Sequence, residues 1–276
     1  MTITERLRTV RRQIWSMTAH LERLLHGLHL CGIACPMSIQ KIAEIAEVVT
    51  KHNLRYVGED DELSIGIGVT AGDSHSQSPA AFPNFRSEIS PTSRLVVHAV
   101  RLPIEEWRSA YRTGIGLFTS KVQEISGQSV PRSIKSRSRL HYWLAEQDER
   151  FVPGQCYPLL LNAEGNITET PTATIVIVDE SRKAMIAPEL ETILHGVTFD
   201  YVATIASNLG LKIERDVISP QKLSHADEVL WLSTPQFILP VTQMDSKPIA
   251  NGQPGRRFHE ILVAIESDVG LALRPL

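Results

Sequence analysis

Residues 134–145 read IKSRSRLHYWLA, and they place Lys135 between the turn-like stretch Pro131-Arg-Ser-Ile134 and a helix-like run from Ser136 to Ala145. A side chain at such a junction can be held in a pocket. The chain has eight lysines against twenty arginines, which narrows the search for an amine nucleophile. Five other lysines fall on predicted helix surfaces, in turns or on an outward strand phase: Lys41, Lys51, Lys183, Lys212 and Lys247. Lys135 is therefore the candidate for covalent chemistry.

The composition is that of a globular protein. Of the 276 residues, 42% are hydrophobic and 21% are charged, so the chain lacks the polar, highly charged composition of a disordered protein. At roughly 150 residues per domain, one large or two modest domains fit this length. The net charge of −3 provides no positive field for nucleic acid, so no nucleic-acid partner is expected.

The cysteines and the N-terminus indicate a cytoplasmic protein. The chain has three cysteines, Cys31, Cys35 and Cys156, and they form no C-x-x-C pair. An odd number without such a pair argues against a disulfide framework and against a four-ligand zinc site. The N-terminus lacks the apolar core of a signal peptide. The aliphatic blocks, such as 175–178, are far shorter than the ~20 residues of a membrane helix, so no membrane partner is expected.

The first part of the chain predicts helices followed by strands. Between residues 18 and 49, apolar residues recur at intervals of three and four residues, which is typical of amphipathic helices. Gly32 and Pro36 divide this stretch into two such helices. Ser38 is placed to cap the second helix. Short β-branched runs at 63–69 and 94–100 predict two strands, joined by a loop that holds Pro79, Pro83 and Pro91.

The polar stretch 103–112 is read as a break between strands, and a domain boundary is placed there. Beyond it, the elements expected are a strand at 114–122, a hairpin at 159–169, a strand at 173–178, a helix at 199–209 closed by Gly210, a helix start at Ser219-Pro220 and a strand at 228–232. The predicted fold class is α+β, with a small N-terminal α/β domain, residues 1–106, and a larger domain, residues 107–276.

Two other candidate sites are rejected on spacing. The glycines of Gly66-Ile-Gly-Val-Thr-Ala-Gly72 do not fit a dinucleotide loop, because the third lies four residues after the second. His26, His29, Cys31 and Cys35 match no usual metal-ligand interval, so no metal site is predicted. The sequence also lacks G-x-S-x-G and H-E-x-x-H.

Four motifs in order around Lys135 resemble those of the class IV aminotransferases. They are Ile134-Lys-Ser-Arg-Ser-Arg-Leu140, Gly165-Asn-Ile-Thr-Glu169, Leu194-His-Gly-Val-Thr198 and Ala226-Asp-Glu-Val-Leu-Trp-Leu-Ser-Thr234. His20-Leu-Glu-Arg-Leu24 is similar to the H-x-x-R-L helix of that family. Each motif alone is weak, but their shared order covers about nine-tenths of the chain. The resemblance implies fold type IV and the cofactor pyridoxal 5'-phosphate (PLP).

Carried over residue by residue, the resemblance makes Lys135 the catalytic residue, which forms the Schiff base with PLP and shuttles a proton at the substrate Cα. Such a lysine needs a neutral amine once it is released, which burial and the charge of the cofactor favour. Glu169 matches the acidic partner of the pyridine nitrogen. Leu194 matches the residue that packs on one face of the ring.

The resemblance also implies a phosphate site. Arg23 matches the arginine that grips the phosphate, and Ser233 and Thr234 match the hydroxyl side of the phosphate cup. Val197 and Thr198 match a pair at a helix start, where backbone N–H groups and the helix dipole favour an anion. Taken singly, Glu169 reads as a strand residue, Thr198 as a helix cap and Arg23 as a surface residue, and their joint order around Lys135 favours the PLP site.

The chain departs from the family pattern at several positions. Thr170-Pro171 replaces a small residue and an asparagine, which changes the hydrogen bonds near the cofactor. Phe199 stands in place of a basic residue and Ser138 in place of an asparagine. The chain starts some thirty residues later than relatives commonly do, so either the small domain is shortened or the true start lies upstream.

One departure bears on the substrate. The strand that ends Thr-Arg-Gly in several relatives reads Thr70-Ala-Gly72 here, so an arginine for the substrate carboxylate is missing. Arg86, Arg94 and Arg137 are the alternatives, and the sequence does not choose among them.

The function predicted from the resemblance is amino-group transfer between an amino acid, of branched-chain or D type, and a 2-oxo acid. Two alternatives stay open: an aminodeoxychorismate lyase that forms 4-aminobenzoate and pyruvate, and a PLP-binding or non-catalytic family member. The resemblance also implies a homodimer.

Overall fold

A computed structural model describes residues 1–72 and 93–273. The chain forms two compact units: unit 1 comprises Met1–Leu102 with Ile134–Ser138, and unit 2 comprises Pro103–Ser133 with Arg139–Leu276. The segment around Lys135 thus belongs to unit 1, although unit 2 sequence flanks it on both sides. The single boundary expected at residue 106 stays a prediction.

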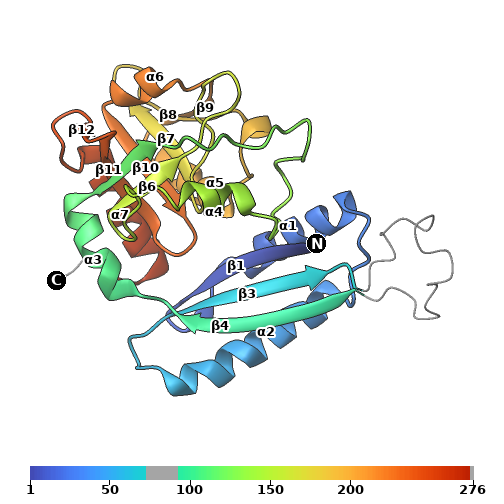
Figure 1. The fold of residues 1–276 in the computed structure, drawn as a ribbon. Coiled ribbons are helices and arrows are strands. Elements are labelled where there is room, and N and C mark those ends of the chain that lie inside the picture. Colours follow the sequence, from blue (N-terminus) through green and yellow to red (C-terminus); the bar gives the residue numbers. More distant parts are fainter. Residues whose placement is uncertain (73–92, 274–276) are drawn as a thin grey trace, which may run out of the picture. The chain divides into compact units, whose positions relative to one another are not determined.

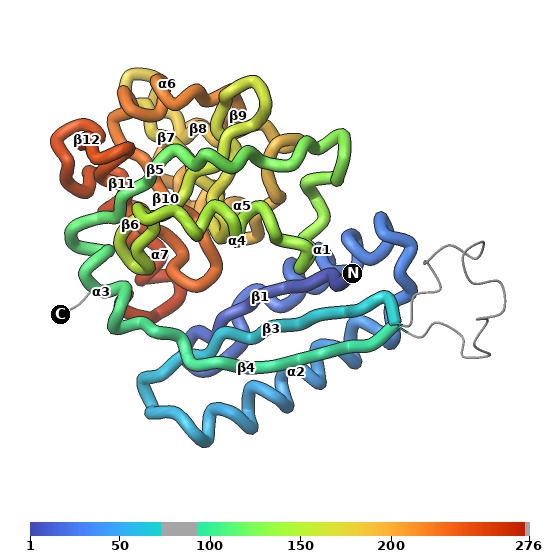
Figure 2. The backbone as a smooth tube through the Cα atoms, viewed as in Figure 1, coloured from blue at the N-terminus to red at the C-terminus, as the bar shows by residue number. Residues whose placement is uncertain are grey.

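Unit 1 is an antiparallel sheet with helices packed against it. The strand order is β2-β1-β3-β4, and Figure 1 shows α1 and α2 beside this sheet. Figure 2 traces β3 and β4 side by side along their length. The elements are β1 Thr2–Val10, β2 Gln13–Ile14, α1 Met17–Leu30, α2 Ile39–Asn53, the 3₁₀ helix η1 Leu54–Tyr56, β3 Leu63–Thr70 and β4 Arg94–Arg101.

The local signals that predicted these helices are present in the structure. Leu21, Leu24 and Leu28 of α1 are buried in the core of unit 1, in one cluster with apolar residues of β1 and β3. Ser38 caps α2, because its Oγ accepts a hydrogen bond from the Lys41 N–H at 3.2 Å. The predicted helices and both predicted strands are confirmed. Strand β1 was not predicted, and Pro79, Pro83 and Pro91 lie outside the described residues.

The helix predicted from Ser136 is wrong in its first turn. Residues 134–138 are extended beside β1: the Thr4 N–H donates to the Lys135 carbonyl at 2.9 Å, and the Arg137 N–H donates to the Thr2 carbonyl at 2.9 Å. Helix α4 begins only at Leu140 and ends at Ala145. Pairing with a strand distant in sequence therefore overrides the local helical pattern.

Unit 2 is a mixed sheet in the order β6-β5-β11-β10-β7-β8-β9, with β12 paired to β11. Helices α5 and α7 pack on each other and on the central strands β10 and β11. The strands are β5 Ile115–Thr119, β6 Cys156–Leu159, β7 Thr174–Asp179, β8 Ala184–Ala187, β9 Lys212–Arg215, β10 Glu228–Ser233, β11 Phe237–Met244 and β12 Lys247–Pro248. The helices are α3 Ile104–Thr113, α4, η2 Leu190–Thr192, α5 Val197–Asn208, α6 Pro220–Ser224 and α7 Arg256–Val269.

Most predicted elements of unit 2 are confirmed. The hairpin closes by a bridge between Leu161 and Ile167, and Ser219 caps α6 by accepting from the Lys222 N–H at 3.1 Å. The polar break predicted at 103–112 is wrong, because helix α3 occupies it. Trp107 is buried, and so are Ala110 and Tyr111, which follow it by about one helical turn. A narrow apolar stripe is therefore enough to fix this helix.

Within the described residues, no helix is long and apolar enough to cross a membrane.

A glutamate from a distant strand caps the start of α7. The N-cap residue, Gly255, has no side chain to cap with, and Glu228 of β10 accepts from the Arg257 N–H at 2.7 Å and from the Phe258 N–H at 2.9 Å. A Cβ at Gly255 would lie 2.1 Å from Glu228 Cδ, so the glycine makes room for this cap. The carboxylate accepts hydrogen bonds from two backbone N–H groups that have no partner within the helix. Its negative charge also interacts favourably with the positive end of the helix dipole.

We expect Glu228→Ala to lower the free energy of unfolding of unit 2 by about 1–2 kcal/mol, the cost of losing a helix cap. Urea unfolding followed by circular dichroism measures this loss. Glu149→Ala, at an exposed residue of the same unit, is the control and should leave the value unchanged. Equal stability of the two variants would show that Glu228 does not cap the helix.

Candidate functional site

The carboxylate of Glu169 is the centre of a buried polar cluster in unit 2. Its Oε1 accepts from Arg132 Nη2 at 2.5 Å and from the Tyr142 hydroxyl at 2.9 Å. Its Oε2 accepts from the Leu194 N–H at 3.3 Å. The structure therefore brings together two residues predicted for the cofactor site, Glu169 and Leu194, and adds Arg132 and Tyr142.

The start of helix α5 brings two predicted hydroxyl groups together. Thr198 Oγ1 lies 3.1 Å from Thr234 Oγ1, which follows β10. Val197 is the first residue of the helix, and the N-cap residue Gly196 makes no side-chain cap. The first backbone N–H groups and two hydroxyls thus lie at one helix N-terminus, an arrangement that suits an anion such as a phosphate.

Ser233 lies next to this helix start, but its hydroxyl has other partners. It donates to Gln236 Oε1 at 2.5 Å and accepts from Trp231 Nε1 at 3.0 Å, and the residue is buried. Thr234, by contrast, is partly exposed. Of the two hydroxyls predicted for the phosphate cup, Thr234 is the one that meets Thr198.

The turn after Glu169 is closed by the threonine that departs from the family pattern. Thr170 Oγ1 accepts from the Ala173 N–H at 3.0 Å, and the Thr170 N–H donates to the Ala173 carbonyl at 3.1 Å. Pro171 lies inside this turn, where it needs no N–H. The changed residues therefore shape the turn that follows Glu169.

Arg23 lies in unit 1 and is held by a buried carboxylate. Glu5 is 1% exposed, and it accepts from Arg23 Nε at 2.8 Å and from Arg23 Nη2 at 2.7 Å. His20 Nδ1 lies 2.8 Å from Glu5 Oε2. Burial raises the pKa of Glu5, but the charge of Arg23 and the hydrogen bonds from Arg23 and His20 together lower it to about 2. Burial lowers the pKa of His20, which favours the neutral ring.

Lys135 lies in the extended segment of unit 1, where it is partly buried. The residues weighed for the substrate carboxylate are separated along the chain: Arg94 begins β4, Arg137 lies two residues after Lys135, and Arg86 lies outside the described residues. Ala71, at the position where relatives carry an arginine, follows β3 and donates its N–H to the Met1 carbonyl at 3.3 Å.

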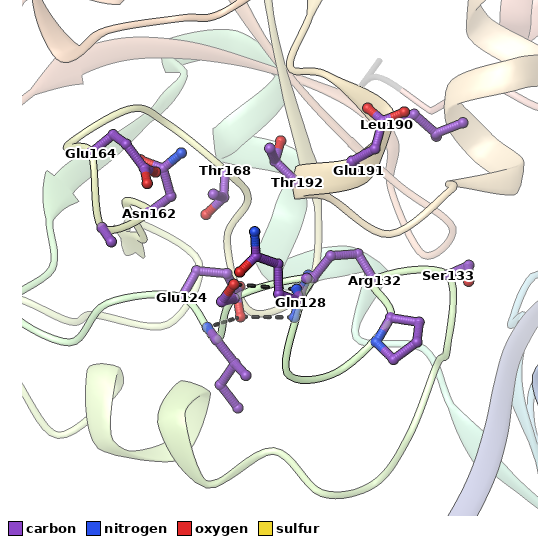
Figure 3. Close-up of a pocket in the computed structure, with 15 residues that line it drawn as sticks. Glu124, Gln128, Arg132, Ser133, Asn162, Glu164, Thr168, Leu190, Glu191 and Thr192 are labelled. Carbon is purple, nitrogen blue, oxygen red and sulfur yellow. Dashed lines mark hydrogen bonds and ion pairs between the residues drawn. The ribbon is translucent and has the colours of Figure 1, made fainter.

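A cavity of about 640 Å³ lies in unit 2 beside the Glu169 cluster. Figure 3 shows Arg132 and Glu124 paired on its wall, with Glu164 and Glu191 among the other lining residues. Sequence reasoning missed Arg132, Glu124 and Tyr142. The stretch Pro131-Arg-Ser-Ile134 carried one signal, a lone arginine three residues before Lys135, but its buried partners come from distant parts of the chain. Among the described residues, no group of three or more His, Cys, Asp or Glu is placed to hold a metal ion.

Residues 2–244 match the family model described as amino-transferase class IV. A probable branched-chain-amino-acid aminotransferase of Aquifex aeolicus is 31% identical over 242 residues, which cover 86% of this chain and 71% of the relative. A D-alanine aminotransferase of Bacillus licheniformis is 25% identical over 173 residues, which cover 63% of this chain and 59% of that protein.

The fold is shared with a solved structure. The crystal structure of the T.th. branched-chain amino acid aminotransferase with pyridoxamine 5'-phosphate matches with a TM-score of 0.81 at 24% identity, over 98% of this chain and 85% of that one. The predicted α+β fold of type IV is therefore confirmed.

The Glu5 carboxylate should make the stability of unit 1 depend on pH. Its folded pKa of about 2 lies below the ordinary value of 4.5, so its contribution is complete above pH 4.5 and is lost as the pH falls toward 2. The size of this contribution at neutral pH is on the order of 3 kcal/mol. Urea unfolding from neutral pH down to about pH 2 should therefore show a smaller acid loss for Glu5→Gln than for the unchanged protein. Glu47→Gln, at an exposed residue of α2, is the control, and an unchanged acid loss in Glu5→Gln would contradict this role.

Proposed function

Because the chain belongs to the class IV aminotransferases, enzymes that depend on PLP, we propose that it moves an amino group between an amino acid and a 2-oxo acid with Lys135 as the residue that binds the cofactor covalently. The family model that matches residues 2–244 is that of the same family that the sequence motifs resemble. Two observations carry the proposal: the buried, hydrogen-bonded Glu169 carboxylate and the pair of hydroxyls, from Thr198 and Thr234, at the start of α5. A carboxylate suits the ring nitrogen of PLP, and the hydroxyl pair suits its phosphate.

The residues of unit 2 fit the chemistry of PLP. Thr198, Thr234 and the first N–H groups of α5 would bind the phosphate, because hydroxyl and amide donors at a helix N-terminus favour an anion. Glu169 would hold a proton at the ring nitrogen, because a carboxylate there favours the charged ring. Leu194, whose N–H donates to Glu169, would pack against the ring.

The residues of unit 1 would supply the other groups. When bound, PLP supplies the electron sink that stabilises negative charge at the substrate Cα. The Lys135 amine would take the proton from that carbon and return it, a task that needs the neutral amine. Arg23 would bind the phosphate, and Glu5 supports this by fixing the guanidinium from two of its nitrogens.

The proposed substrates are amino acids of the branched-chain or D type, because the relatives carry the names branched-chain-amino-acid and D-alanine aminotransferase. We further propose a homodimer in the cytoplasm, which the family resemblance and the cysteine pattern support. Arg86, Arg94 and Arg137 are the proposed alternatives for binding the substrate carboxylate.

Lys135→Ala should abolish turnover, because it removes the amine that both binds the cofactor and moves the proton. The measurement is turnover of a panel of branched-chain and D-amino acids with 2-oxo acids, together with borohydride reduction of the PLP-loaded protein and peptide mapping. The label should map to Lys135, and Lys51→Ala, at an exposed lysine, should behave as the unchanged protein. Release of pyruvate from aminodeoxychorismate without an acceptor would indicate a lyase, and a label elsewhere would exclude Lys135.

Thr198→Val and Thr234→Val should each weaken PLP binding about tenfold or more, because each removes a hydroxyl that hydrogen-bonds to a charged phosphate. The Kd is measured by titrating the protein with PLP and following absorbance. Thr204→Val is the matched control, since this exposed threonine lies on the same helix and donates to the Asp200 carbonyl. Equal Kd values for all three variants would place the phosphate elsewhere.

A further inference from the structure

Glu169 belongs to a buried group of four side chains that we call the Arg132 cluster: Glu124, Arg132, Tyr142 and Glu169. Arg132 Nη1 lies 2.9 Å from Glu124 Oε1, and its Nη2 donates to Glu169 Oε1 at 2.5 Å and to the Tyr142 hydroxyl at 2.8 Å. The Arg132 side chain is 10% exposed, and those of Glu124 and Glu169 are 2% and 8% exposed. One guanidinium therefore joins two carboxylates that are largely out of water.

Arg132 is charged and Tyr142 is neutral in this cluster. Burial lowers the pKa of Arg132, but the interactions with Tyr142, Glu169 and Glu124 raise it by more than burial lowers it. The guanidinium therefore stays charged. Burial raises the pKa of Tyr142 well above its usual value, so the phenol is neutral. Its single proton reaches Glu124 Oε2 or Glu169 Oε1, both at 2.9 Å, and can be donated to one of them at a time. Arg132 is thus the constant donor to Glu169 Oε1.

The two oxygens of Glu169 have unequal surroundings. Oε1 receives Arg132 and Tyr142, whereas among the described residues Oε2 receives the Leu194 N–H at 3.3 Å, a long hydrogen bond. A carboxylate oxygen can accept more than one hydrogen bond. Oε2 therefore keeps acceptor capacity on the side of Leu194, the residue proposed to pack against the ring.

We propose that Arg132 is a positioning residue that turns Glu169 Oε2 toward the ring nitrogen of PLP and keeps the shared proton on that nitrogen. This inference rests on the proposed function. The guanidinium fixes Oε1 and stabilises the negative charge of the carboxylate in a site with little water, so the proton gains less by moving from nitrogen to oxygen. Without Arg132, Oε1 would keep only the proton that Tyr142 shares with Glu124, and the carboxylate would be held less firmly.

Glu124 and Tyr142 hold Arg132 in this role. Glu124 pairs with Nη1 on the cavity wall, where Figure 3 shows the two side chains joined. Glu124 also accepts from the Ile125 N–H at 2.8 Å, which ties the carboxylate to its own backbone. His141 Nε2 lies 3.0 Å from Glu124 Oε1. Burial raises the pKa of Glu124, but the close contact with His141 and the charge of Arg132 outweigh it and lower the pKa, so Glu124 is an anion.

The test separates the charge of residue 132 from its hydrogen bonds. Arg132→Gln keeps a donor and removes the charge, and Arg132→Lys keeps the charge. Each variant is loaded with PLP labelled with ¹⁵N in the ring, and the ¹⁵N chemical shift reports whether the ring nitrogen carries a proton. We expect Arg132→Gln to shift the signal toward the unprotonated value and to lower turnover about tenfold or more, the scale of one charge-assisted hydrogen bond. Arg132→Lys should keep the protonated signal.

Two further variants make the outcome decisive. Arg132→Gln leaves two carboxylates buried without a cation, and if it fails to fold, the double variant Glu124→Gln/Arg132→Gln removes one charge of each sign and should show the same ¹⁵N shift. Glu164→Gln changes an exposed glutamate that lines the same cavity and should keep the signal of the unchanged protein. Thermal unfolding without PLP shows that each variant is folded.

The inference and the proposed function fail in different ways. If the unchanged protein gives a protonated ring signal and the charge-removing variants give the same signal, Arg132 has no such role, while the PLP site stands. A shift in Glu164→Gln as large as that in Arg132→Gln would also overturn the role of Arg132. If the unchanged protein binds no PLP, or if borohydride labels no lysine, the proposed function itself fails.

Discussion

The hydrogen bonds between strand β1 and residues 134–138 are the constraint on which the proposed site depends. Thr4 and Arg137 supply the two donors, and both bonds are 2.9 Å long. They make a five-residue stretch part of unit 1, although the residues before and after it belong to unit 2. Because these bonds run along the main chain, they fix the backbone of Lys135 whatever side chains surround it, and a covalent catalyst needs such a fixed backbone.

Buried charge in both units follows the same rule. A buried ion is costly unless it is paired and hydrogen-bonded, and each charged residue proposed for the phosphate or the ring has such a partner. Glu5 holds Arg23 in unit 1, and Arg132 holds Glu169 in unit 2. In each pair one member is not among the residues that the family motifs identify, so the motif residue is placed by a neighbour that the motif does not contain.

The sequence predicted the elements whose signals are local. The stripe of α1, the caps at Ser38 and Ser219 and the hairpin before Glu169 could be read from short windows, because helix caps and turns act over three or four residues. The motif order likewise identified Thr198 and Thr234, which the structure places 3.1 Å apart.

The parts that could not be predicted depend on partners distant in sequence. Residues 134–138 have a helical pattern but pair with β1, and Arg132 reaches Glu169 across 37 positions. Helix α3 was hidden by its exposed charges, because its buried stripe is short, and tertiary contacts that a single sequence does not record decide such cases.

Gly196 connects the fold to the proposed anion site. A Cβ at this position would lie 3.2 Å from Thr174 Oγ1, closer than side chains usually pack, so the approach of the helix start to β7 favours glycine. Glycine has no side-chain oxygen with which to cap the helix, and in the structure Gly196 makes no side-chain cap to α5. The residue that lets α5 approach the sheet therefore also leaves its first N–H groups without a cap, and a bound phosphate would satisfy them. Close packing and the proposed anion site thus favour the same residue.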